Sequence, residues 1–161
     1  MRVAGRYFVT ALQTIVSRRI DPFDTASVTI GSFDGVGSYN AIKQAVTLKG
    51  DVRVMKESTR KVIREQIETL VHGVEVMFGV QAELDYDDNY PVLVNDLAIM
   101  TPAVDSIQRG GVAKVFDCGP QDPSEDFAYF AQSLPAAFLY IGCAKDDGLD
   151  HPPSQSRLFH G

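Results

Sequence analysis

The feature that most constrains the fold is a long amphipathic helix near the middle of the chain. Between residues 57 and 79, apolar side chains recur at steps of three and four residues, and charged side chains occupy the opposite face. The apolar members are Ile63, Ile67, Leu70, Val71, Val74, Met77 and Phe78. Glu57-Ser58 is suited to begin this helix and Gly79 to end it. Such a stripe, about four turns long, must be covered by another structural element.

The neighbouring segments have the patterns that such a cover requires. Residues 3–19 carry a second apolar stripe at helical spacing, and residues 25–33 and 45–55 alternate like a pair of antiparallel strands. Residues 80–86 alternate again, so residues 3–86 predict the order α-β-β-α-β. A β-α-β-β-α-β unit would need one more strand upstream. We therefore expect an α+β protein, with a two-layer α/β sandwich of ferredoxin-like type that lacks its first strand.

The second half of the chain has a different texture. Residues 87–91 (DDNYP) predict a linker, after which Asn95 or Asp96 can cap a short helix that reaches about Gln108. Residues 112–118 and 136–142 predict strands, and Ser124 predicts the start of another helix. We divide the chain at this linker into residues 1–86 and residues 87–161.

Composition excludes several classes of partner. The 161 residues carry a formal charge of −6, so neither nucleic acid nor an anionic membrane is expected as a partner. There is no apolar run long enough to span a bilayer, and residues 1–7 lack the apolar core of a signal peptide. Cys118 and Cys143 have no metal-type spacing and fit two reduced thiols. We expect a cytoplasmic protein.

Several phrases, taken in order, resemble the M20 peptidase family and especially its aminoacylase and hippurate-hydrolase-like branch. They are residues 11–18 (ALQTIVSR), 21–22 (DP), 28–33 (VTIGSF), 50–53 (GDVR), 124–130 (SEDFAYF) and 151–153 (HPP). The resemblance implies a catalytic α/β domain that binds two divalent metal ions, zinc or manganese-like, and an inserted lid that mediates homodimerisation. On this mapping, residues 1–86 are most of the lid, and residues 87–161 are the incomplete C-terminal part of the catalytic domain. A separate N-terminal half would supply the other metal ligands and the catalytic Glu.

The resemblance also implies roles for individual residues. His151 matches a family metal ligand, although a solvated loop histidine fits its residue type as well. His72 and His160 lack ligand spacing and are interpreted as surface residues. One histidine cannot hold a catalytic metal, which needs about three protein ligands. We therefore expect the chain by itself to bind no metal stably and to be inactive.

The loop between the two predicted strands departs from the family pattern. Asn40 matches a family asparagine that contacts the substrate, and a turn residue is the alternative reading. Asp34 stands where the family has a histidine that stabilises the tetrahedral intermediate, and Lys43 stands where a proline is expected. An anion at residue 34 would repel a developing oxyanion. We therefore do not expect this loop to be catalytic.

Two further sets of charged residues complete the candidate site. Arg53 fits either a contact to a substrate carboxylate or a surface charge. Glu125 and Asp126 fit the first turn of a helix and are interpreted as site-supporting. The sequence thus predicts part of a metal-dependent amidohydrolase of N-acyl amino acids or small peptides. The alternative is a non-catalytic dimerisation module derived from the lid.

Overall fold

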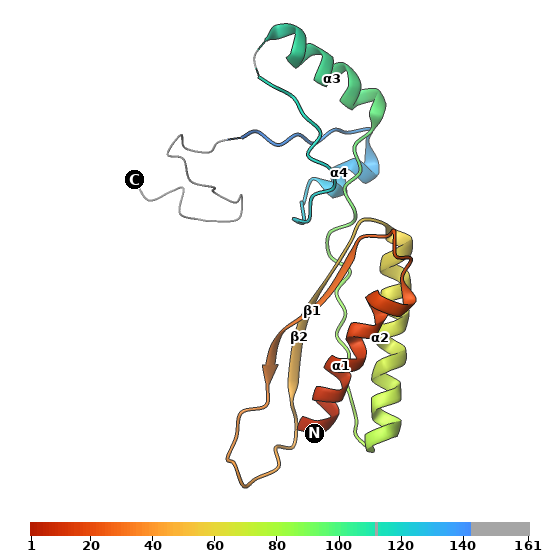
Figure 1. The fold of residues 1–161 in the computed structure, drawn as a ribbon, viewed down its shortest axis with the longest axis vertical. Coiled ribbons are helices and arrows are strands. Elements are labelled where there is room, and N and C mark those ends of the chain that lie inside the picture. The colour runs from red at the N-terminus through yellow and green to blue at the C-terminus, as the bar shows by residue number, and fades with distance from the viewer. Residues whose placement is uncertain (112, 143–161) are drawn as a thin grey trace, which may run out of the picture.

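The computed structural model describes residues 1–111 and 113–142. In chain order its elements are α1 (Arg2–Arg19), β1 (Ala26–Asp34), β2 (Thr47–Val54), α2 (Glu57–Phe78), α3 (Leu97–Gly110) and α4 (Ala128–Ser133). The first four elements form two elongated layers, in which helices α1 and α2 lie beside a two-stranded hairpin (Figure 1). Helices α3 and α4 lie beyond one end of these layers. The predicted α+β class is confirmed.

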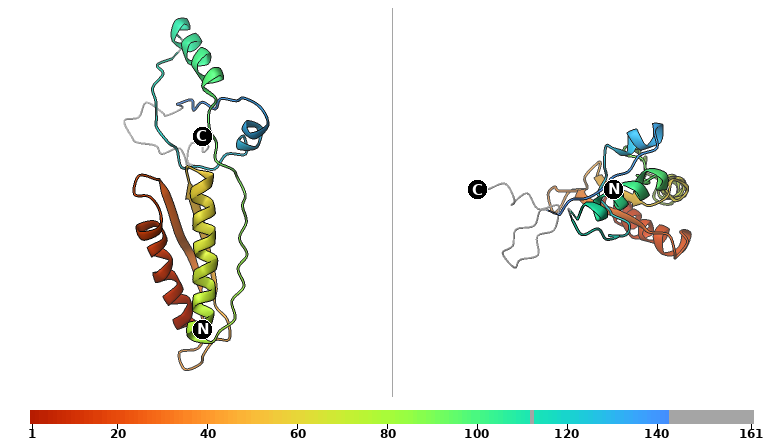
Figure 2. Two further views of the ribbon diagram at one scale, coloured as in Figure 1. Left: turned by 90° about the vertical axis from the view of Figure 1, so that its right-hand side faces the viewer. Right: turned by 90° about the horizontal axis from the view of Figure 1, so that it is seen from above.

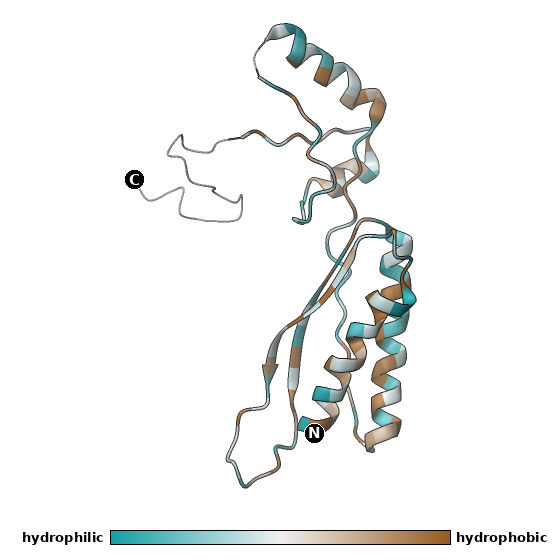
Figure 3. Ribbon diagram, in the orientation of Figure 1, coloured by the Kyte–Doolittle hydropathy of each residue, from teal (hydrophilic) through white to brown (hydrophobic). Residues whose placement is uncertain are grey.

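Local chemistry accounts for the C-terminal ends of helices α1 and α2. Arg18 and Arg19 lie in the last turn of α1, where the negative end of the helix dipole favours cations. Helix α2 ends at Gly79, which adopts a left-handed φ of 60° and donates its backbone N–H to the carbonyl of Glu75. The predicted start of α2 at Glu57 is confirmed, but no side chain caps that end. The apolar stripe of α2 is visible along the helix in Figure 3.

Strands β1 and β2 are antiparallel, and their pairing runs from Ala26 opposite Val54 to Asp34 opposite Thr47. The register shifts between Ile30 and Ser32, at Gly31. Gly50 lies against the partner strand, because a Cβ there would sit 2.5 Å from the carbonyl oxygen of Thr29. This position therefore requires glycine.

The core lies where the two helices meet the hairpin. Leu12 and Ile15 of α1 and Ile63 and Ile67 of α2 are buried together. Half-buried side chains from the strands pack against them, namely Ala26, Val28, Ile30, Val52 and Val54. Both layers follow from the sequence, because the alternation of the strands and the apolar stripes of the helices give each element one apolar face.

Polar contacts join the turn before β1 to the start of α2. Asp24, in the turn before β1, accepts hydrogen bonds from Lys56 and from the hydroxyl of Thr59, the latter at 2.9 Å. Thr59 is the buried polar residue of the described chain. The Lys56 hydrogen bond, followed by that of Thr59, holds the pKa of the Asp24 carboxyl below its ordinary value.

The strand predicted at residues 80–86 is wrong. This segment is in neither a helix nor a strand and pairs with no strand among the residues described. Tyr86 nevertheless packs against the core cluster, with the guanidinium of Arg64 over its ring at 5.3 Å. A strand needs a neighbour for its backbone groups, and no described strand pairs with residues 80–86.

The second region, residues 87–142, differs more from expectation. Helix α3 starts as predicted, because the Asp96 side chain accepts hydrogen bonds from the backbone N–H groups of Ala98 and Ile99. Helix α4 begins at Ala128, not at Ser124, since residues 125–128 first make a tighter turn.

The strands predicted at 112–118 and 136–142 are also wrong over the residues that the structure describes there. The Asn95 side chain accepts from the backbone N–H of Phe138 at 2.7 Å and donates to its carbonyl at 3.1 Å. One side chain thus takes the place of a neighbouring strand at that residue. Elsewhere the segment exposes apolar side chains such as Ile141, which is 89% exposed.

Within residues 1–111 and 113–142, no helix combines the length and the apolar character needed to cross a membrane.

Candidate functional site

The loop that joins β1 to β2 is closed at its base by an ion pair. The Lys43 ammonium lies 3.2 Å from the Asp34 carboxylate, which also accepts a hydrogen bond from the backbone N–H of Val36. These contacts, that of Lys43 foremost, hold the pKa of Asp34 below its ordinary value. Asp34 is therefore an anion engaged in loop structure. The two residues that depart from the family pattern are partners of each other.

The tip of this loop projects into solvent. Val36, Tyr39 and Ile42 are 83%, 99% and 91% exposed. Asn40 is exposed beside them, and its side-chain oxygen accepts a hydrogen bond from the hydroxyl of Ser38. Asn40 is thus part of a turn at the exposed tip of the loop.

Arg53 lies at the other end of the hairpin and connects the two regions. Its Nε lies 2.6 Å from Asp51, and its Nη1 lies 3.2 Å from the Asp122 carboxylate in the loop before α4. Nη1 also donates to the Asp122 carbonyl at 3.4 Å. The hydrogen bond to Asp51 and then the charges of both acids raise the pKa of Arg53. Its charge is matched by carboxylates of the chain itself.

Asn40 and Arg53 do not share a site within one copy of the chain. Arg53 pairs with Ser27 near the start of β1, whereas the loop carrying Asn40 follows Asp34 at its end. At about 3.3 Å per strand residue, these ends are roughly 20 Å apart. A single small substrate cannot contact both residues of one chain.

Glu125 and Asp126 precede helix α4, so their side chains do not lie in its first turn. Their carbonyl groups accept the N–H groups of Ala128 and Tyr129 in the tighter turn. Glu125 is half-buried near Tyr140, whose pKa is raised first by burial and then by the charge of Glu125. The backbone of Glu125 and Asp126, and not their carboxylates, forms this turn before α4.

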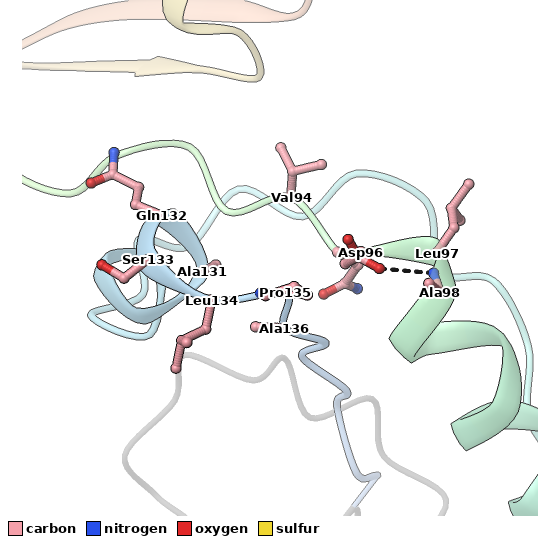
Figure 4. Close-up of a pocket in the computed structure, with 11 residues that line it drawn as sticks. Val94, Asp96, Leu97, Ala98, Ala131, Gln132, Ser133, Leu134, Pro135 and Ala136 are labelled. Atoms are coloured by element: carbon pink, nitrogen blue, oxygen red, sulfur yellow. Dashed lines mark hydrogen bonds between the residues drawn. The ribbon is translucent and has the colours of Figure 1, made fainter.

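An open groove of about 640 Å³ separates the start of α3 from the end of α4 (Figure 4). It is lined by residues 94–98 and 131–136. The carboxylate in this lining belongs to Asp96 and is already engaged in capping α3. The groove therefore offers no free group for acid–base work.

Among residues 1–111 and 113–142, no three His, Cys, Asp or Glu side chains converge as metal ligands. The residues described do not fit a catalytic metal centre, which needs about three protein ligands. His151, the predicted ligand, lies outside the described residues, as does His160. His72 is exposed on α2, 3.8 Å from Glu75.

Sequence reasoning did not single out Asp122, the partner of Arg53. The two residues are 69 positions apart, and no motif links them. The sequence did contain a signal for the Asp34–Lys43 pair, because both residues depart from the family pattern in the same loop.

Comparisons with known proteins agree with the resemblance. Residues 9–156 match the profile of peptidase family M20/M25/M40. N-acetyldiaminopimelate deacetylases from Halalkalibacterium halodurans and Bacillus subtilis are 35% and 30% identical to this chain, over 92% and 94% of its length. The chain spans 40% of the length of each of these relatives.

A solved structure shows the same fold. A protein from methicillin-resistant Staphylococcus aureus that is assigned as an aminohydrolase superposes with a TM-score of 0.82 and 48% sequence identity. The match covers 93% of this chain and 39% of the other chain.

Proposed function

Because the chain belongs to peptidase family M20/M25/M40, we propose that it forms the lid and the C-terminal catalytic segment of a metal-dependent amidohydrolase. The observation that carries this proposal is the match over residues 9–156, which includes both regions of the chain. The complete enzyme hydrolyses N-acyl amino acids or small peptides. The names of the relatives favour an N-acetylated diamino acid such as N-acetyldiaminopimelate. In this proposal the reaction takes place in the cytoplasm.

The division of labour follows from the proposed domains. Residues 1–86 are the lid, and residues 87–161 return to the catalytic domain. Two divalent metal ions, zinc or manganese-like, act in the complete enzyme, with His151 as one ligand. The other ligands and the general base belong to an N-terminal half, as another part of the protein or as a separate chain. Residues 1–161 alone therefore lack the means to activate water.

Arg53 is the proposed receptor for the substrate carboxylate, because a guanidinium binds a carboxylate through two parallel hydrogen bonds. Its ion pairs with Asp51 and Asp122 are exposed to solvent and are readily exchanged. Asn40 is the second proposed substrate contact. The separation of Asn40 from Arg53 supports a homodimer through the lid, in which Asn40 serves the site of the partner.

The direct test measures metal and turnover together. The purified 161-residue chain is incubated with zinc or manganese and desalted, and its metal content is read by mass spectrometry. Acetate release from N-acetyldiaminopimelate is then measured. From the chain alone we expect sub-stoichiometric metal and no turnover. When the N-terminal half is supplied, we expect stoichiometric metal and acetate release. Stoichiometric metal with turnover in the chain alone would overturn the proposed division.

A second candidate function is a non-catalytic dimerisation module. The Asp34–Lys43 pair favours it, because a loop closed by its own ions and exposing Val36, Tyr39 and Ile42 suits a docking contact. Light scattering at high protein concentration tests this reading, since a monomer contradicts it. The variant Tyr39→Ser should weaken the dimer, whereas Lys49→Ser, on the polar face of β2, should leave it unchanged.

A further inference from the structure

A linker leads from α2 to the distal segment, which we define as residues 95–142, and it runs beside α2 on the way (Figure 2). Arg60 donates from Nη2 to the carbonyl oxygen of Tyr90 at 2.7 Å, and Glu57 accepts the backbone N–H of Val92 at 2.7 Å. The two side chains also pair with each other, with Arg60 Nε 3.4 Å from Glu57 Oε2. Because the Arg60 side chain is 18% exposed, solvent screens its charge only in part. The start of α2 therefore fastens the linker.

Within this linker, Tyr90 has a backbone conformation that its own chemistry disfavours. Its φ is 57°, and no other non-glycine residue of the described chain has a positive φ. The Cβ atom makes this left-handed region costly for most residues, and tyrosine lacks the short polar side chain that makes it accessible to asparagine. Tyr90 also precedes Pro91, whose ring restricts the residue before it to extended backbone. Contacts with the rest of the protein must therefore hold Tyr90 in this conformation.

The distal segment holds the same residue from the other side. The hydroxyl of Tyr129, on α4, accepts the backbone N–H of Tyr90 at 3.2 Å, and the two ring centroids are 6.3 Å apart. The N–H and C=O groups of Tyr90 thus bind different parts of the protein. Other contacts across this junction are weak, because neither α3 nor α4 packs extensively against α1, α2 or the hairpin in the part of the chain that the structure describes. The Arg53–Asp122 ion pair also crosses the junction, but both side chains are exposed.

We propose that Tyr90 is a two-state hinge that sets the orientation of the distal segment relative to α1, α2 and the hairpin. The left-handed state, held by Glu57, Arg60 and Tyr129, keeps the orientation observed. When these contacts are lost, Tyr90 returns to the extended backbone that Pro91 favours, and the chain beyond it leaves in another direction. Hinges are a few residues that take up a large change in φ and ψ in this way. The inference is independent of the proposed hydrolysis.

Helix α3 follows the position of the distal segment, because its start is tied to the chain just after α4. The backbone N–H of Asp96, the residue that caps α3, donates to the carbonyl of Ala136 at 2.8 Å. The neighbouring Asn95 side chain binds both backbone groups of Phe138. A distance from α2 to α3 therefore reports the state of the hinge.

The test measures that distance between two spin labels by pulsed electron resonance. The labels are attached to cysteines that replace exposed Lys61 of α2 and exposed Gln108 of α3, and serine replaces Cys118 and Cys143. Labelled chain is diluted with unlabelled chain, so that only distances within one copy are read. The two central variants are Tyr90→Asn and Tyr90→Val. Both remove the ring, but asparagine accepts the left-handed region, whereas β-branched valine does not.

With Tyr90 present we expect one narrow distance distribution. In Tyr90→Val a second population should appear, and the ratio of second to first should be about tenfold smaller in Tyr90→Asn. Tyr129→Phe, which removes the hydroxyl that Tyr90 reaches, should also raise the second population, whereas Tyr7→Phe on α1 should not. Equal distributions in the two Tyr90 variants, or a broad distribution with Tyr90 present, would overturn the hinge. A changed distance between labels at residues 13 and 61, on α1 and α2, would contradict it too, because Tyr90 would then support the fold of those helices.

Discussion

Replacing Ile63 by alanine tests whether the junction of α1, α2 and the hairpin is the stabilising core. Ile63 is fully buried against Leu12, Ile15 and Ile67. Truncation removes three carbons, worth roughly 2.4 kcal/mol of transfer free energy. The unfilled cavity adds about 1 kcal/mol, and the higher helix propensity of alanine returns about 0.4 kcal/mol. We expect the free energy of unfolding to fall by about 3 kcal/mol.

The assay is urea unfolding followed by circular dichroism at a helix-sensitive wavelength. The slope m of the unfolding free energy against urea concentration is compared between the variants. Val76→Ala is the matched control, because Val76 lies on the same helix and is 72% exposed. It should change the free energy by less than about 0.5 kcal/mol. Ile63→Val should fall between the two, at a loss of about 1 kcal/mol. The reasoning is refuted if Ile63→Ala costs no more than Val76→Ala at equal m.

Three further predictions concern single contacts. The pKa of Asp24 is lowered by its hydrogen bond from Lys56, so this contribution is present above the ordinary value of 3.8 and is lost as the pH falls below it. Asp24→Asn should therefore flatten the acid side of a plot of urea midpoint against pH. Asp96→Ala should lower the local stability of α3 by about 1 kcal/mol, read from amide exchange in α3 against α4. Gly50→Ala should destabilise by about 2 kcal/mol through its clash with the neighbouring strand. Gly73→Ala, in open space on α2, should stabilise by about 0.5 kcal/mol, and equal effects of the two alanines on the thermal midpoint would contradict the packing described.

Helices were the most predictable part of this fold, because their signals are local. The stripe of α2, the left-handed stop at Gly79 and the cap at Asp96 each act within a few residues. The hairpin was predictable for a similar reason, since β1 and β2 are close in sequence and alternate on one face. The start of α4 was not, because Ser124 has the residue type of a cap, whereas the helix begins only at Ala128.

The three incorrect strands share one physical cause. Residues 80–86, 113–118 and 136–142 have strand composition, and the structure places them in neither a helix nor a strand. Composition expresses a preference for a pleated, half-buried surface, whereas a strand exists only when a neighbour pairs with it. Asn95 illustrates the difference, because its side chain alone satisfies the backbone of Phe138.

The candidate site was likewise predictable from the sequence only in part. The family phrases identified Asn40 and Arg53 from the sequence, but the hairpin then placed them at opposite ends of its strands. Asp34 and Lys43 were recognisable as departures from a pattern, and only their distance showed that they neutralise each other.

By itself the amino-acid sequence determined the family, the two amphipathic helices and the antiparallel hairpin, because these depend on periodicity and on short motifs. The tertiary structure decided which segments of strand composition are paired and that Arg53 meets Asp122 across 69 residues. Those properties depend on contacts between distant parts of the chain. Local side-chain patterns do not encode which distant backbone is available to pair.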